Sequence, residues 1–282
     1  MKIKWGKKRL MAGGLIGVCL LLLVGYMGQS IKRVDLEGMI TVAHRGAANF
    51  APENTMSSFQ KGLDLGADFI EGDVHLSKDG ELIVIHDESV DRTTNGKGLV
   101  KNFTLDELKK LDAGTSFHSD FEGEAIITLN ELLEEFYGKI GILIEIKNPS
   151  LYPGIEEKVV EILDQYNDLQ SIVVQSFSEH ALKKIHELNP KLQIAVLIET
   201  STTPISSKKL NDLTSFATYI NFNISNLNKR MVDEIHQREG KVLVWSKTDP
   251  KLIQKAFRYG VDGIITDFSS WPYLPPVYVA EE

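Results

Sequence analysis

Short apolar runs rich in β-branched residues alternate with amphipathic helical stretches from about residue 40 to residue 268. Continuous apolar strands separated by helices are typical of a parallel sheet that is buried on both faces. Eight such units over about 240 residues favour an irregular (β/α)8 barrel of the TIM type over an open, doubly wound α/β sheet. No Gly-x-Gly-x-x-Gly or phosphate-loop pattern follows the first strand, which disfavours a dinucleotide-binding domain. We expect strands at residues 40–43, 69–74, 142–146, 172–174, 194–197, 218–221, 242–245 and 263–266, and helices at residues 56–65, 129–137, 155–166, 179–188, 229–238 and 251–259.

Two segments interrupt this alternation. A further apolar run at residues 82–85 follows the second strand after Ser77-Lys78-Asp79-Gly80, and Asp-Gly is typical of a tight turn, so we expect a hairpin there. Residues 87–127 then contain no barrel strand, and an interval of this length usually carries a small subdomain of its own. Within it, the spacing of Thr104 and Glu107 is that of a capping box, which predicts a short helix through Leu111.

The net charge of −8 combines two parts of opposite sign. Residues 1–33 contain seven basic residues and no acidic one, whereas residues 34–282 contain 24 basic and 39 acidic residues and carry −15. An acidic domain disfavours a nucleic-acid partner. Residues 10–27 are almost wholly apolar or Gly, which is long enough for one helix to cross a bilayer. The preceding basic residues predict a cytoplasmic N-terminus and a domain outside the cytoplasm.

A cleavable signal peptide is the alternative interpretation of this segment. Gly28-Gln29-Ser30 supplies a weak small-residue cleavage pattern, and the protein would then be secreted. The length of the apolar run favours the uncleaved form, a cell-membrane anchor at residues 1–33 followed by the barrel domain at residues 34–282. Cys19, the only cysteine, lies in the apolar run in a context that fits lipidation poorly, and a single cysteine excludes an intrachain disulfide.

Polar side chains gather where the predicted strands end. In (β/α)8 barrels the C-terminal ends of the strands form the mouth that holds the active site. Residues two apart on a strand share a face, so Glu71 and Asp73 should point to the same side, as should Glu145 and Lys147. The polar and aromatic residues at these ends are His44, Arg45, Glu71, Asp73, His86, Asp87, Glu145, Lys147, Asn221, Trp245 and Asp267.

Three of these residues are carboxylates that should converge: Glu71, Asp73 and Glu145. Ion pairs with Arg or Lys can absorb one or two of them, but three converging anions repel one another unless a cation lies among them. We therefore favour a metal site over ion pairing alone. The oxygen ligands predict a hard divalent ion, Mg2+ or Ca2+, whereas zinc more often recruits histidine or cysteine.

The remaining side chains at the strand ends suggest the reaction. His44 and His86 each follow an apolar strand, and two histidines beside a metal site suit general acid–base catalysis. Arg45 and Lys147 add positive charge, which predicts an anionic substrate, and phosphate fits best. The residues thus predict metal-assisted cleavage of a phosphoester. His75 also ends a strand, without a clear role.

At these residues the chain resembles the glycerophosphodiester phosphodiesterase family. The matching motifs occur in order and span residues 40–268, so no single short motif carries the resemblance. They are His44-Arg45-Gly46, Pro52-Glu53-Asn54-Thr55, Glu71-Gly72-Asp73-Val74-His75, Ile85-His86-Asp87, Asp91-Arg92-Thr93-Thr94-Asn95-Gly96, Glu145-Ile146-Lys147 and Gly263-Ile264-Ile265-Thr266-Asp267.

The resemblance implies an irregular barrel with a family insertion at residues 87–127. It also implies hydrolysis of a glycerophosphodiester to glycerol 3-phosphate and an alcohol, with one Ca2+ or Mg2+ ion as cofactor. Gly72 stands where the family usually has an apolar residue, from which we expect a small loss of packing and little effect on metal ligation. Carried over by position, the resemblance implies His44 and His86 as the acid–base pair, Glu71, Asp73 and Glu145 as metal ligands, Arg45 and Lys147 as phosphate contacts, and Trp245 as part of the pocket wall. Glu53 matches the family motif and is either a substrate contact or part of the local structure around the first loop.

Several alternatives stay open at this stage. The attacking group is either water or the glycerol hydroxyl next to the phosphate, which would give a cyclic intermediate. A related activity is a phospholipase D-like reaction on a lysophospholipid at a membrane. A different class is a membrane-tethered binding module without catalysis, which the complete set of histidines and acids disfavours. Polymers of glycerol phosphate are a further substrate class, suggested by the outward orientation of the domain.

Overall fold

The computed structural model describes residues 31–33, 38–199, 205–246, 255–256, 258–267 and 278–280. The chain divides into two compact units. One spans Met1–Leu36 and Pro275–Glu282, and in it strand β1 (Ile31–Arg33) pairs antiparallel with β12 (Tyr278–Ala280). The other spans Glu37–Leu274. The expected membrane helix at residues 10–27 lies outside the described residues, and within them no helix has the length and apolarity to cross a bilayer.

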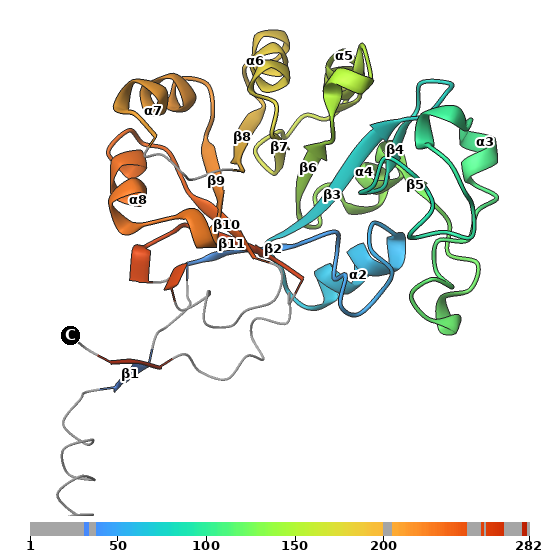
Figure 1. Ribbon diagram of the computed structural model, residues 1–282, viewed down its shortest axis with the longest axis horizontal. Coiled ribbons are helices and arrows are strands. Elements are labelled where there is room, and N and C mark those ends of the chain that lie inside the picture. Colours follow the sequence, from blue (N-terminus) through green and yellow to red (C-terminus); the bar gives the residue numbers. More distant parts are fainter. Residues whose placement is uncertain are drawn as a thin grey trace, which may run out of the picture. The chain divides into compact units, whose positions relative to one another are not determined.

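Eight parallel strands of the second unit close into a barrel, as the alternation predicts (Figure 1). The last strand pairs with the first, with Ile264 opposite Thr41, and this pairing closes the ring. In the order of the ring, the strands are β2 (Ile40–Ala43), β3 (Phe69–Leu76), β6 (Gly141–Ile146), β7 (Ile172–Ser176), β8 (Gln193–Ile198), β9 (Tyr219–Asn223), β10 (Leu243–Ser246) and β11 (Gly263–Thr266).

Helices connect the strands on the outside of the barrel (Figure 1). Most begin at a side chain that accepts a hydrogen bond from a backbone N–H of the first turn: Thr55, Thr128, Ser178, Ser206 or Asn228. The helix expected at residues 251–259 lies largely outside the described residues. The described helices are α2 (Met56–Asp64), α4 (Leu129–Phe136), α5 (Ile155–Leu163), α6 (Glu179–Leu188), α7 (Ser207–Thr214) and α8 (Lys229–His236), with single 3-10 turns η3 (Pro149–Leu151) and η4 (Ile224–Asn226).

The expected hairpin and insertion are both present. Strand β4 (Leu82–Val84) runs antiparallel to the second half of β3, and the two-residue strand β5 (Ile127–Thr128) extends this pair. Between them lie η1 (Val100–Asn102), α3 (Leu105–Leu108) and η2 (Ser119–Phe121). The capping box of Thr104 and Glu107 starts α3 as predicted, but the helix ends at Leu108 rather than Leu111. The reason is that the backbone N–H groups of Lys110 and Leu111 bond three residues back, which tightens the chain into turns.

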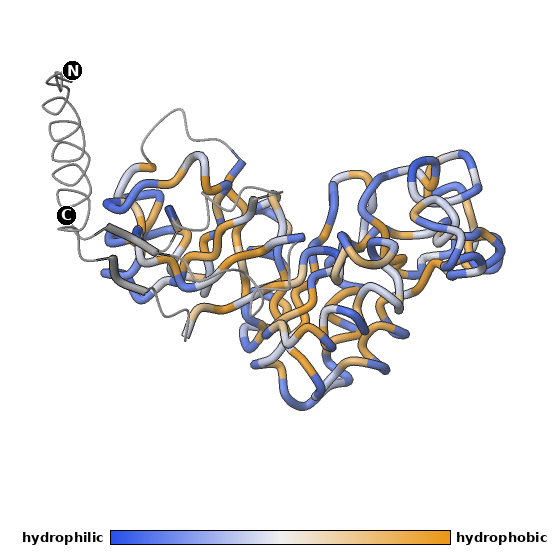
Figure 2. Tube along the Cα trace, turned by 90° about the horizontal axis from the view of Figure 1, so that it is seen from below, coloured by the Kyte–Doolittle hydropathy of each residue, from blue (hydrophilic) through white to orange (hydrophobic). Residues whose placement is uncertain are grey.

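A layer of apolar side chains fills the barrel interior, one from each strand: Val42, Phe69, Leu143, Val173, Ala195, Tyr219, Leu243 and Ile265. Figure 2 shows hydrophobic residues concentrated along the barrel strands. Because residues two apart on a strand point to the same side, the residues two positions further on form the next layer toward the mouth. That layer consists of His44, Glu71, Glu145, Gln175, Leu197, Asn221, Trp245 and Asp267. Strand periodicity thus places the candidate site directly above the apolar layer.

Candidate active site

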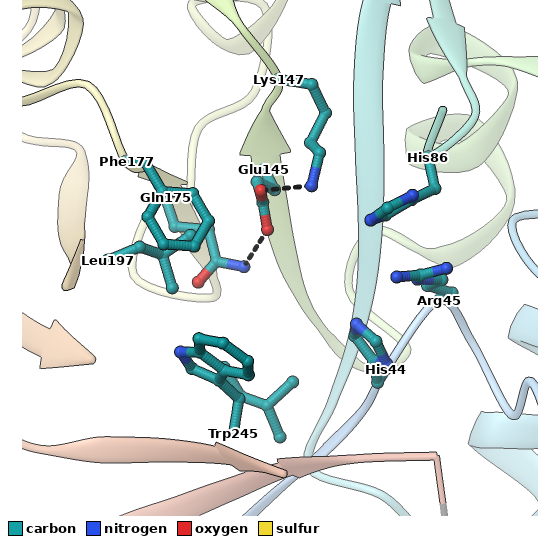
Figure 3. Close-up of a pocket in the computed structure, with 10 residues that line it drawn as sticks. His44, Arg45, His86, Glu145, Lys147, Gln175, Phe177, Leu197 and Trp245 are labelled. Atoms are coloured by element: carbon teal, nitrogen blue, oxygen red, sulfur yellow. Dashed lines mark hydrogen bonds and ion pairs between the residues drawn. The ribbon is translucent and has the colours of Figure 1, made fainter. Parts of the chain in front are cut away.

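A cavity of about 180 Å³ opens at the C-terminal ends of the strands (Figure 3). Charged side chains lie along one side of it, and Phe177, Leu197 and Trp245 lie along the other. The cavity brings together six of the residues singled out from the sequence: His44, Arg45, His86, Glu145, Lys147 and Trp245. Gln175, Phe177, Leu197 and Ile265 complete its lining, although the sequence patterns did not single them out as site residues.

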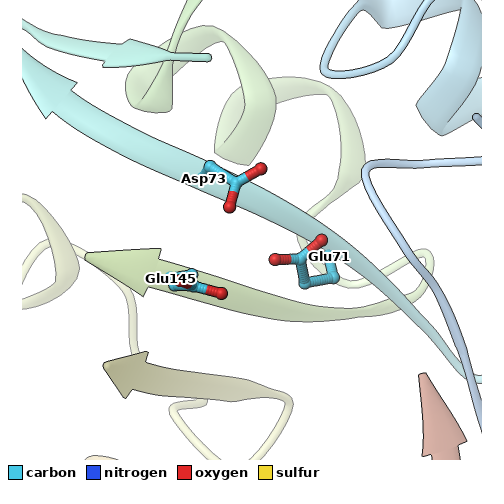
Figure 4. A group of neighbouring side chains, drawn as sticks. All are labelled: Glu71, Asp73 and Glu145. Carbon is cyan, nitrogen blue, oxygen red and sulfur yellow. The ribbon is translucent and has the colours of Figure 1, made fainter. Parts of the chain in front are cut away.

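Three buried carboxylates meet beneath the charged side. Glu71 and Asp73 come from β3, and Glu145 comes from the neighbouring strand β6, where it pairs in register with Asp73 (Figure 4). All three residues are buried, with at most 7% of each residue's surface exposed, and one oxygen of each lies within 4.8 Å of the others. The alternation of side chains along β3 therefore produces the predicted convergence.

Ion pairs satisfy two of these carboxylates in part. Lys147 Nζ lies 2.6 Å from Glu145 Oε1 and 3.4 Å from Asp73 Oδ1, and Arg45 Nε lies 3.8 Å from Asp73 Oδ2. Glu71 has no such partner among the described cations. Its Oε2 accepts a hydrogen bond from the backbone N–H of Arg45 at 2.8 Å, and its buried Oε1 accepts none.

The crowding of these anions shows in their pKa values. Burial, reinforced by the charge of Asp73, raises the pKa of Glu71 to about 8. The same two causes raise the pKa of Glu145. Burial opposes the ionisation of Asp73 as well, but Lys147, His86 and Arg45 outweigh it and hold the pKa of Asp73 at about 2. The positive charge of the nearby side chains therefore does not offset the repulsion at Glu71 and Glu145.

A hard divalent cation fits this cluster. All the donors are carboxylate oxygens, which Ca2+ and Mg2+ prefer. The buried Oε1 of Glu71 and Oδ1 of Asp73 accept no hydrogen bond, so each has a lone pair available to an ion. The set contains three acids from two adjacent, fully paired strands, which fixes the ligands before an ion binds.

Each of the two histidines at the mouth is held by a carboxylate through Nδ1. His44 Nδ1 lies 2.5 Å from Asp267 Oδ1, and His86 Nδ1 lies 2.7 Å from Asp87 Oδ1. An ionised carboxylate only accepts hydrogen bonds, so in both rings Nδ1 carries the proton and the neutral ring has its lone pair on Nε2. Both rings line the cavity, and in both the carboxylate contacts Nδ1 rather than Nε2.

The surroundings move the pKa values of these histidines in opposite directions. Burial lowers the pKa of His44, but the hydrogen bond to Asp267 and the charge of Glu71 outweigh it, so the net shift is upward. For His86, burial together with the positive charges of Lys147 and Arg45 outweighs the nearby acids, and the pKa is lowered. Two imidazoles at one cavity thus differ in protonation tendency.

Other residues of the first loops hold these groups in place. Asn54 donates from Nδ2 to Asp73 Oδ2 at 2.9 Å and accepts the backbone N–H of Asp73 at 3.2 Å. Glu53 does not line the described cavity; its Oε1 accepts from Arg45 Nη1 at 2.9 Å, so it contacts a cavity residue instead. Gln175, two positions after the apolar layer on β7, donates to Glu145 Oε2 at 3.3 Å. The period of two along β7 was the signal that could have identified Gln175.

The chain matches known proteins over the whole barrel. Residues 44–270 match the model of the glycerophosphoryl diester phosphodiesterase family. A glycerophosphodiester phosphodiesterase of Caldanaerobacter subterraneus subsp. tengcongensis is 40% identical over 230 residues, covering 81% of this chain and 93% of that protein. One from Bacillus subtilis is 34% identical over 245 residues, covering 82% of this chain and 84% of that protein.

A solved structure matches as well. A phosphodiesterase of Oleispira antarctica, in complex with the product sn-glycerol-3-phosphate, is 30% identical and superimposes with a TM-score of 0.75, covering 82% of this chain and 94% of that one. The sequence matches, the barrel fold and the residues at the barrel mouth thus point to the same family. The chain belongs to the glycerophosphoryl diester phosphodiesterase family and is a phosphoric diester hydrolase that acts on glycerophosphodiesters.

Proposed function

We propose that this enzyme requires a divalent cation, Ca2+ or Mg2+, and uses His44 and His86 as the acid–base pair that releases glycerol 3-phosphate and an alcohol. One observation carries the proposal. Two imidazoles, each held at Nδ1 by a carboxylate, line the same cavity as two cationic side chains, with three buried carboxylates beneath them.

Arg45 and Lys147 are the proposed contacts of the phosphodiester. Both line the charged side of the cavity, and a guanidinium matches the geometry of two phosphate oxygens (Figure 3). Trp245 and its neighbours on the apolar side would contact the carbon skeleton of the substrate. The product bound by the Oleispira antarctica relative supports glycerol 3-phosphate as the part that this cavity recognises.

Glu71, Asp73 and Glu145 would hold the cation. When bound, a divalent ion supplies positive charge that stabilises the phosphate oxygens in the transition state. The chain's own residues perform the proton transfers. Nε2 of one histidine takes a proton from the attacking group, and Nε2 of the other donates a proton to the departing alkoxide, while the Nδ1 bonds keep both rings oriented.

Replacement of either histidine tests the acid–base assignment. We expect His44→Ala and His86→Ala each to reduce kcat by about 100-fold or more, the range of a lost general acid or base. Circular dichroism should show an intact fold. His118→Ala is the matched control, because that histidine is exposed in the insertion. Activity near that of the unmodified enzyme in either variant would refute the pair.

Substrate and cation are tested together. The full chain is assayed with glycerophosphocholine, glycerophosphoethanolamine and a lysophospholipid, each with Ca2+, with Mg2+ or with chelator. Release of glycerol 3-phosphate from the first two, and its loss with chelator, supports the proposal. Cleavage of the lysophospholipid alone would replace it with a lipid-directed activity, and turnover that persists with chelator would refute the cation requirement. Trapping a cyclic phosphate product would identify the glycerol hydroxyl as the attacking group.

We also propose that residues 10–27 anchor the enzyme in the cell membrane with the barrel outside the cytoplasm. The support is the uncharged apolar run and the basic residues before it. Membrane fractionation and protease accessibility in intact cells test it. A barrel found in the medium, with a new N-terminus near residue 30, would show cleavage instead.

A further inference from the structure

Arg92, in the first turn of the insertion, bridges two loops of the barrel. Its Nε and Nη2 donate to Asp87 at 2.7 and 3.0 Å, and its Nη1 and Nη2 donate to Glu53 at 2.7 and 2.8 Å. One planar guanidinium therefore makes a two-point contact with a carboxylate on either side. Each of these carboxylates in turn holds a residue of the cavity.

The two carboxylates hold two different side chains of the cavity. Asp87 Oδ1 holds His86 Nδ1 at 2.7 Å, and Glu53 Oε1 holds Arg45 Nη1 at 2.9 Å. A continuous chain of hydrogen bonds thus runs from His86 through Asp87, Arg92 and Glu53 to Arg45. It joins the side chain proposed for proton transfer to the side chain proposed for phosphate binding.

Arg92 is 46% exposed, and most exposed ion pairs contribute little. The contacts of Arg92 should be stronger, because both are two-point contacts and both partners are more buried. The side chains of Glu53 and Asp87 are 18% and 31% exposed. Arg92 lowers the pKa of Asp87 against the effect of burial. Burial also opposes the ionisation of Glu53, but Arg92 and Arg45 outweigh it and lower that pKa as well.

The loop that carries Arg92 is itself held in place within the insertion. The buried Thr94 donates from Oγ1 to the backbone oxygen of Val90 at 2.7 Å and accepts the N–H of Gly96 at 3.0 Å. Val90 is fully buried in an apolar cluster that Val100, Leu108 and Ile126 of the insertion form together with Ile83 of β4. Buried neighbours therefore fix the backbone of the loop that carries the Arg92 guanidinium.

We propose that Arg92 is a positioning residue that couples His86 to Arg45, so that the insertion holds the proton-transfer and phosphate-binding groups of the barrel in one arrangement. The proposal rests on the roles proposed above for His86 and Arg45. A lysine could not replace Arg92 fully, because a single ammonium lacks the planar fork that contacts both carboxylates at two points.

Kinetics test the coupling. We expect Arg92→Met to lower kcat/KM by about 10- to 100-fold, the range of a geometric defect at a reacting centre, with both a lower kcat and a higher KM. Asp87→Asn should lower mainly kcat, Glu53→Gln should raise mainly KM, and Arg92→Lys should fall between Arg92→Met and the unmodified enzyme. Arg230→Met, which removes an exposed Arg–Glu pair on α8, is the matched control and should leave the kinetics unchanged.

A double-mutant cycle separates coupling from a general loss of structure. The effects of Asp87→Asn and Glu53→Gln should be non-additive when Arg92 is present and additive in the Arg92→Met background. Additive effects in both backgrounds, or kinetics of Arg92→Met within twofold of the unmodified enzyme, would overturn the proposal.

A spectroscopic measurement tests positioning by Arg92 separately from the proposed acid–base role of His86. In 15N-labelled enzyme, Arg92→Met should shift the ring nitrogen signals of His86 and leave those of His44 in place, because His44 is held by Asp267. Unshifted His86 signals would refute positioning by Arg92. Shifted signals in an enzyme whose His86→Ala variant stays active would preserve the positioning role and refute the acid–base assignment.

Discussion

Gly72 lies between two of the clustered carboxylates and faces away from them, as expected. The expected loss of packing, however, was wrong, because another side chain occupies the space. A Cβ built on Gly72 would lie 3.1 Å from Phe59 Cζ and 3.4 Å from Val84 Cγ1. Phe59 is fully buried and packs edge-on against Phe136, with ring centroids 6.1 Å apart. Phe59 of α2 therefore supplies the volume that an apolar residue in the strand would otherwise provide.

This packing predicts the effect of Gly72→Ala. Overfilling a packed core costs about 1–3 kcal/mol, whereas the lower backbone entropy of the unfolded alanine variant returns about 0.4–1 kcal/mol. We expect a net destabilisation of about 1 kcal/mol in urea unfolding. In the Phe59→Leu background, which makes room at this position, the cost should be smaller. An equal cost in both backgrounds would contradict contact with Phe59.

The residues that could be predicted from the sequence are those fixed by strand geometry. His44, Glu71 and Glu145 each lie two positions after an apolar interior residue, so the period of a strand places them at the mouth. The same period places Asp267 at the mouth, but its contact with His44 could not be predicted in this way. Asp267 is 223 residues away and becomes a neighbour only because β11 pairs with β2 and closes the barrel.

Among the helices and strands, those with a clear hydrophobic periodicity could be predicted from the sequence. All eight barrel strands were predicted within two residues at each end. Strand β3 continues two residues beyond its predicted end because its last residues, His75 and Leu76, pair with β4. Helix α7 was missed, since only Leu210 and Leu213 of its eight residues are buried and its surface is otherwise polar. An apolar stripe of two residues is too short to predict a helix.

The last part of the insertion is a loop that side-chain hydrogen bonds hold together. Asp112 accepts four hydrogen bonds, from the backbone N–H groups of Gly114, Thr115 and Gly123 and from the Thr115 hydroxyl, at 2.6–3.0 Å. These bonds join the two ends of the segment at residues 112–123. The Thr115 hydroxyl and the three N–H groups lower the pKa of Asp112, because they stabilise its ionised form.

The lowered pKa gives a pH dependence of stability. A carboxylate with a folded-state pKa below its ordinary value of about 3.9 stabilises the fold above that pH, and the contribution is lost as the pH falls through the folded-state pKa. Asp112→Asn should therefore lower the Tm at pH 7, and the difference from the unmodified enzyme should shrink below about pH 4. Asp106→Asn, at an exposed acid of the same insertion, is the control. A Tm difference that is independent of pH would contradict the role of the charge.

In the folded molecule as a whole, the three buried carboxylates repel one another, and this repulsion lowers the stability of the barrel. They come from the adjacent strands β3 and β6, and the pairing of these strands above the apolar layer fixes their positions. Repulsion within the cluster opposes closure of the barrel unless positive charge is added. Because a bound ion relieves this repulsion only in the folded state, cation binding and folding should be linked.

This linkage predicts that Ca2+ or Mg2+ raises the Tm of chelator-treated enzyme. At a concentration about 100 times the Kd, one bound ion adds about 2.7 kcal/mol to the free energy of unfolding. For a domain of this size that corresponds to a Tm increase of roughly 5–10 °C. Glu71→Gln should abolish the increase, whereas Glu135→Gln, at an exposed acid on α4, should retain it. A Tm that does not respond to either ion, or an increase that persists in Glu71→Gln, would show that the cluster is not the cation site. Differential scanning calorimetry measures all three proteins under the same conditions, and the ion that shifts the Tm at the lower concentration is the one that the cluster binds more tightly.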